Sequence, residues 1–97
     1  MIEIDWAGIN RRKKRELADL VLDQMRLKRE LMALAHRAGH AQNAVDLNTS
    51  VSGLAADEVA KLTAEFRTKL NRFQQIEERK TSLRIGIIKT EFKIQTS

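Results

Sequence analysis

Apolar residues recur at intervals of three and four along two long stretches of the chain. This is the spacing of the seam along which the helices of a coiled coil meet. The first series is Leu17, Leu20, Leu27, Leu31, Leu34 and Ala38, with Gln24 in step, and the second is Val59, Leu62, Phe66, Leu70, Phe73, Ile76 and Leu83. The pattern predicts an all-α fold, an antiparallel two-helix hairpin with helices over about 10–38 and about 54–90.

Turn-forming residues are concentrated between the two stretches, from Gly39 to Gly53. Gly39 directly follows the last periodic position, which is typical of the left-handed residue that ends a helix. We therefore expect the first helix to end there. A length of 97 residues predicts a single helical-hairpin domain over 1–97.

The pattern of the C-terminal tail fits two kinds of secondary structure. Leu83, Ile85 and Ile87 alternate with other residues, which is typical of a strand. The spacing of Leu83 and Ile87 also suits a helix, and no turn signal separates the tail from the second stretch. We predict that the helix continues and leave an extended tail as the alternative.

The first stretch carries a second apolar stripe beside its seam. Its members are Ala18, Val21, Leu22, Met25, Met32 and Ala35. A helix with two apolar stripes needs two neighbours, because large exposed apolar patches are uncommon on monomers. The second stretch has one narrower stripe, so the first is expected to complete a bundle by binding a second copy or a larger protein partner. The residues predicted to bind it are Val21, Leu22, Met25, Arg29 and Met32.

Charge suggests a different function. Eighteen Lys and Arg against 13 Asp and Glu give a net charge of +5, and the densest basic run is Arg11, Arg12, Lys13, Lys14 and Arg15. Such a run can bind phosphates, so a small basic protein associated with nucleic acid is the alternative. Few aromatic residues accompany the run, which favours binding without base specificity.

The sequence contains no pattern typical of an enzyme. It has no cysteine, and its four glycines are too scattered for a phosphate-binding loop. His36 and His40 have the spacing of half a metal site, but a helix end explains both more simply. We therefore expect no catalytic residues, no cofactor, no metal and no small-molecule substrate.

No apolar run is long enough to span a bilayer, and acidic residues near the N-terminus do not resemble a signal peptide. These features predict a cytoplasmic protein that does not bind membranes. The function expected is protein–protein interaction without catalysis, as an adaptor, assembly subunit, small chaperone or inhibitor.

Overall fold

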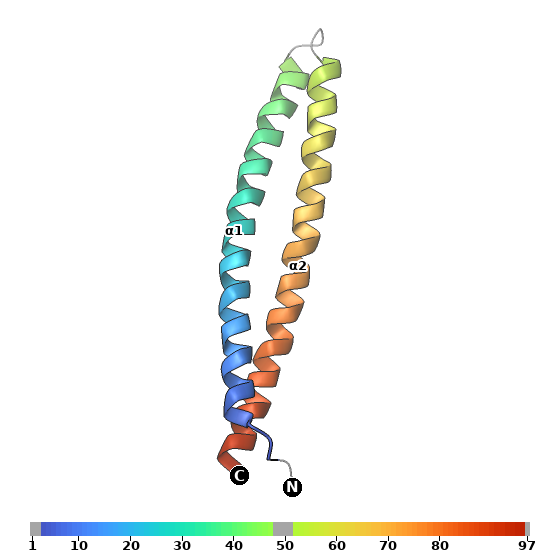
Figure 1. Ribbon diagram of the computed structural model, residues 1–97. Coiled ribbons are helices and arrows are strands. Elements are labelled where there is room, and N and C mark those ends of the chain that lie inside the picture. Colours follow the sequence, from blue (N-terminus) through green and yellow to red (C-terminus); the bar gives the residue numbers. More distant parts are fainter. Residues whose placement is uncertain (1–2, 48–51, 97) are drawn as a thin grey trace. The chain divides into compact units, whose positions relative to one another are not determined.

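The chain is an all-α two-helix hairpin. The computed structural model describes residues 3–47 and 52–96, and side chains over 3–40 and 56–96. Helix α1 spans Trp6–Leu47 and helix α2 spans Ser52–Thr96 (Figure 1). The described residues contain no strand. The predicted fold class is confirmed, although both helices are longer than the sequence pattern indicated.

Helix α1 begins at Trp6 because Asp5 caps it. The Gly8 amide donates to Asp5 Oδ1 at 2.9 Å, and the Ile9 amide donates to the Asp5 carbonyl at 3.0 Å. An aspartate in this position satisfies an amide that would otherwise lack a partner within the helix. Because of this cap, α1 begins before residue 10, where the apolar pattern predicted its start.

The prediction that Gly39 ends α1 is wrong. The helix continues to Leu47, and no described glycine has a positive φ. A side chain at Gly39 would meet no atom within 4 Å. The predicted connection between the helices extended from Gly39 to Gly53, but residues 39–47 and 52–53 are helical, and 48–51 lie outside the described part of the chain.

The C-terminal tail is helical up to Thr96, as predicted. Its alternating pattern arises because two helical faces are interleaved. Leu83 and Ile87 are buried, whereas Ile85, Ile88 and Phe92 are exposed on another face. The expectation of a single apolar stripe therefore fails at this end of α2.

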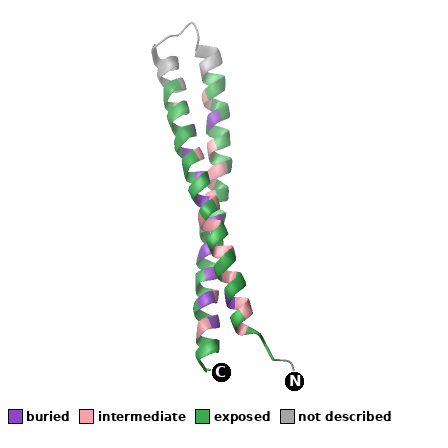
Figure 2. Cartoon of the chain, turned by 60° about the vertical axis from the view of Figure 1, so that its left-hand side comes forward, coloured by how far each residue is buried: buried purple, intermediate pink, exposed green. Residues whose placement is uncertain are grey.

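The hairpin divides into two compact units, of which the first comprises residues 1–24 and 75–97. Its buried apolar side chains are Ile76, Leu83 and Ile87, all from α2. Its buried polar side chains are Asn10, Gln24, Lys80 and Thr90. On α2, the buried positions of this unit follow one another at intervals of three and four residues, namely Ile76, Lys80, Leu83, Ile87 and Thr90. Figure 2 shows buried positions on both helices in purple. Polar groups thus make up much of the interior of this unit.

The second unit, residues 25–74, has an apolar interior. Leu27, Leu31 and Leu34 of α1 and Leu62 of α2 are buried. Leu34 and Leu62 form a cluster against which Ala38, Val59 and Phe66 pack. An ion pair between Lys69 Nζ and Glu30 Oε2, at 2.9 Å, also joins the helices of this unit.

Threonine hydroxyls along α2 donate to the backbone one turn earlier. The donor–acceptor pairs are Thr63 to Val59, Thr68 to Ala64, Thr81 to Glu77, Thr90 to Gly86 and Thr96 to Phe92. These bonds satisfy hydroxyls locally. Only Thr90 among these threonines is buried.

Candidate functional site

The predicted binding face of α1 is largely exposed. Leu22, Met25 and Met32 are 63%, 50% and 65% exposed, values typical of surface residues rather than of a core. Arg29 is also exposed, and Val21 is half-buried. Val21 and Leu22 belong to the first unit, and the other three residues to the second. The structure thus leaves four of the five predicted residues accessible to a partner.

Within the second unit, this face is apolar at its centre and basic at its edges. At about 100° per residue, Met25, Arg29 and Met32 fall within about 60° of one another around α1. Lys28 lies beside Met32 in the same projection. Over residues 25–40 of α1, where the structure describes the side chains, the one acidic residue is Glu30, which lies on another side and pairs with Lys69. The face therefore complements an apolar surface with acidic edges.

The basic run at the start of α1 is not a uniform patch. Lys13 is half-buried, and its Nζ donates to Thr90 Oγ1 at 3.4 Å. Lys14 Nζ pairs with Glu91 Oε1 at 3.0 Å. Arg11, Arg12 and Arg15 are exposed, as the nucleic-acid interpretation requires. Two of the five cations thus bind α2 instead of facing solvent alone.

The carboxylates that meet basic side chains in the first unit are held in their charged form. Arg79 donates through Nε and Nη2 to Glu16 at 2.9 and 3.0 Å, and these bonds lower the pKa of Glu16. The bond from Lys14 is the largest cause of the lowered pKa of Glu91. Each of these pairs joins α1 to α2, so their charges help to fix the contact between the helices.

A polar layer interrupts the interior of the first unit at Gln24. Lys80 Nζ donates to Gln24 Oε1 at 2.5 Å and to Glu77 Oε1 at 3.3 Å. Gln24 Nε2 donates to the same Glu77 oxygen at 2.5 Å, and this bond is the largest cause of the lowered pKa of Glu77. The sequence shows Gln24 in the apolar series but gives no sign that Lys80 is its partner.

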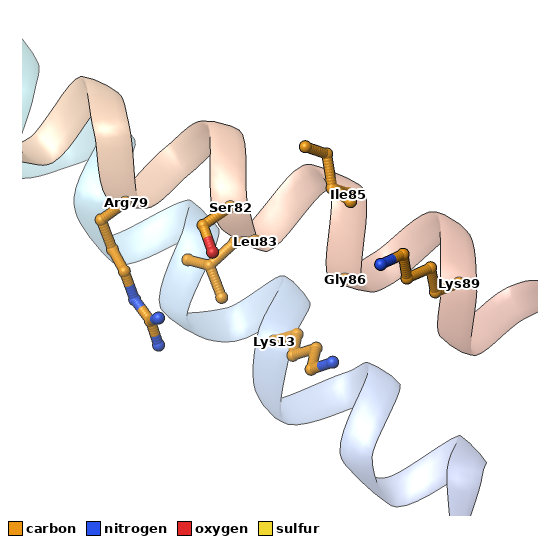
Figure 3. A pocket seen from close by; sticks show the side chains of 7 residues that line it. All are labelled: Lys13, Arg79, Ser82, Leu83, Ile85, Gly86 and Lys89. Atoms are coloured by element: carbon orange, nitrogen blue, oxygen red, sulfur yellow. The ribbon is translucent and has the colours of Figure 1, made fainter.

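A half-open groove of about 320 Å³ lies beside Lys13 in the first unit (Figure 3). Its lining residues are Lys13, Arg79, Ser82, Leu83, Ile85, Gly86 and Lys89. A Cβ on Gly86 would lie 3.0 Å from Lys13 Nζ, so the absence of a side chain there lets this ammonium lie against α2. Sequence reasoning missed the groove, because Gly86 appeared only as an isolated glycine within a helical pattern.

His36 and His40 contact each other on the exposed side of α1. Their Nε2 atoms are 3.1 Å apart, and the rings meet edge to face with centroids 4.5 Å apart. Their predicted role at a helix end is wrong, because α1 continues to Leu47. No group of three potential metal ligands occurs among the described residues.

Comparisons with family models, curated proteins and solved structures give no match to this chain. Within the described ranges, neither helix combines the length and hydropathy needed to cross a bilayer. The case for a function therefore depends on the surfaces described above.

Proposed function

We propose that the hairpin is a binding module that docks an acidic amphipathic helix of a partner protein on the exposed face of α1. The observation that carries the proposal is the exposure of Met25 and Met32 on a face whose neighbouring charges are basic. Amphipathic helices commonly bind in this way, with apolar residues spaced by three and four along the contact.

The chemistry of this face supports an acidic partner more than a second copy of the chain. Two copies meeting through it would bring Arg29 and Lys28 of each against the same cations of the other, and facing like charges oppose association. A helix with Glu or Asp along its edges would pair with those cations. The flexible methionines suit such a contact, because they adapt to partner side chains of different shapes.

Synthetic helical peptides with one apolar face can test the proposal directly. One peptide has Glu along both edges of that face, and its matched control has Lys at the same positions. We expect the Glu peptide to shift the methyl NMR signals of Met25 and Met32, with Met1 as an internal reference, and the Lys peptide to bind at least about tenfold more weakly. Equal binding of the two peptides would contradict the proposed partner chemistry.

A charge introduced at Met32 and a test of self-association provide two further controls. Met32→Glu should abolish the shift at Met25, whereas Met32→Leu should retain it, because only the first variant places a charge in the contact. Sedimentation at increasing protein concentration tests the second copy. A dimer whose formation shifts both methionine signals without peptide would refute the acidic partner in favour of self-association.

A further inference from the structure

We propose that the groove around Gly86 is a binding site for a phosphate group. Lys13 and Lys89 both line it, from α1 and α2 respectively, and Ser82 supplies a hydroxyl (Figure 3). The site lies within the first unit and is separate from the proposed docking face on α1. It requires no part of the proposed protein-binding function.

Positive charge in the groove exceeds the negative charge that accompanies it. Arg79 is the one lining cation paired with a carboxylate, that of Glu16. Within the described part of the chain, Lys13 makes one hydrogen bond, to the Thr90 hydroxyl, and its length of 3.4 Å is long for such a bond. An ammonium has three donors and prefers charged acceptors, so Lys13 retains donors for an anion.

The absence of a side chain at Gly86 lets the Lys13 ammonium lie close to α2. Lys13 lies across the α2 backbone at Gly86, where any Cβ would press on its Nζ. Lys89 follows three residues later on α2, and Ser82 precedes Gly86 by one helical turn. Figure 3 shows the Lys13 side chain of α1 and the Lys89 side chain of α2 next to Gly86, whereas Ile85 points away from α1. A phosphate between the two ammonium groups would have charge-assisted donors from both helices.

Phosphate chemistry fits this groove better than a planar carboxylate does. A phosphate group has oxygens in several directions, so it can accept bonds from Lys13, Lys89 and Ser82 together. Lysine binds phosphate as a point charge and needs no fixed planar geometry. The source could be a free phosphate or a phosphodiester of a nucleic acid chain, and these sources share the same group.

The test uses the full chain, labelled with ¹⁵N and titrated with inorganic phosphate at constant ionic strength. We expect saturable shifts of the Ser82, Gly86 and Lys89 amides. Lys89→Gln should weaken binding about threefold to fivefold, the upper range for one partly exposed ion pair. Lys61→Gln is the matched control, because it removes the same charge from an exposed position of the second unit. Equal weakening by both variants would refute a localised site, as would the absence of saturable shifts.

Gly86→Ala separates binding from damage to the fold. Alanine is the better helix former, so the thermal midpoint should stay the same or rise, while its Cβ displaces Lys13 and weakens phosphate binding. Unchanged phosphate binding in this variant would overturn the role of the close approach between Lys13 and Gly86.

A short single-stranded oligonucleotide is the ligand in a second titration. Competition with inorganic phosphate at the same amides identifies phosphodiesters as ligands, and shifts confined to Arg11, Arg12 and Arg15 would place nucleic acid elsewhere and count against the groove.

Discussion

Replacing Gln24 with leucine should destabilise the hairpin, although it places an apolar residue at a buried position in the apolar seam. Lys80 Nζ would lose its 2.5 Å acceptor while remaining buried, with Glu77 as its acceptor in the layer. Loss of a hydrogen bond to a charged group costs about 1.5–3 kcal/mol. Burial of the larger apolar side chain returns about 1 kcal/mol. We therefore expect a net loss of about 0.5–2 kcal/mol in the free energy of unfolding.

A double-mutant cycle in urea isolates the contribution of the pair. Lys80→Leu alone leaves Gln24 Oε1 buried without its donor, at a cost of about 1–3 kcal/mol. The double leucine variant should recover the stability of the original chain or exceed it, because well-packed apolar residues replace buried charged groups without penalty. Gln75→Leu, at an exposed position of the same unit, should change stability by less than about 0.5 kcal/mol.

Additive effects of the two single substitutions, within about 0.5 kcal/mol, would refute the coupling between Gln24 and Lys80. The double variant has a second expected outcome. Buried polar residues in a seam restrict register and oligomeric state, at a cost in stability. Sedimentation should therefore detect more self-association in the double variant than in the original chain, even though its unfolding free energy is equal or higher.

Three further predictions concern helix ends and charge. Gly39→Ala should stabilise the protein by about 0.5–1 kcal/mol, because Gly39 is helical with open space around it. A loss of stability in thermal unfolding would instead support Gly39 as the residue that ends the helix. Asp5→Ala should cost about 1 kcal/mol, whereas Asp5→Asn should retain most of the cap, and equal losses in urea unfolding would contradict the capping role. Acid should destabilise the fold, because hydrogen bonds to Glu16, Glu30 and Glu91 lower the pKa values of these carboxylates in the folded state. The stability that the three carboxylates confer is complete above the pKa of about 4.3 for an unfolded glutamate, and it is lost as the pH falls through their folded pKa values. An unfolding free energy that stays constant from neutral pH into this acidic range would contradict the last prediction.

The apolar periodicity was sufficient to predict the hairpin because most seam positions are buried or half-buried. Leu27, Leu31, Leu34, Leu62 and Leu83 all lie in the interior, as their spacing requires. The ends of the helices depend on different physics. A glycine favours a helix end only when it adopts a left-handed conformation, and the surroundings of Gly39 do not impose one. The cap at Asp5 involves an amide three residues away, which an apolar pattern does not detect.

The candidate sites were predictable only where they lie on one helix. The exposed stripe containing Met25 and Met32 follows from helical spacing, so the sequence alone identified its members. The groove combines Lys13 with residues more than sixty positions later, and its formation depends on the alignment of α1 with α2. The pattern of a single sequence gives the period of each helix but not the alignment of one helix with the other. The sequence therefore does not distinguish Lys13, which contacts α2, from the other members of the basic run.

The hydrogen bond between Lys13 and Thr90 fixes the orientation of a hydroxyl group. An ammonium only donates, so Thr90 Oγ1 accepts from Lys13 and directs its own hydrogen to the Gly86 carbonyl, 2.7 Å away. The chain of donors therefore has one polarity, from the charge on α1 into the backbone of α2. Valine at position 90 would fill nearly the same volume yet remove both bonds, so Lys13 would lose its one hydrogen-bond partner in the described structure, and its ammonium would be free to turn to other acceptors.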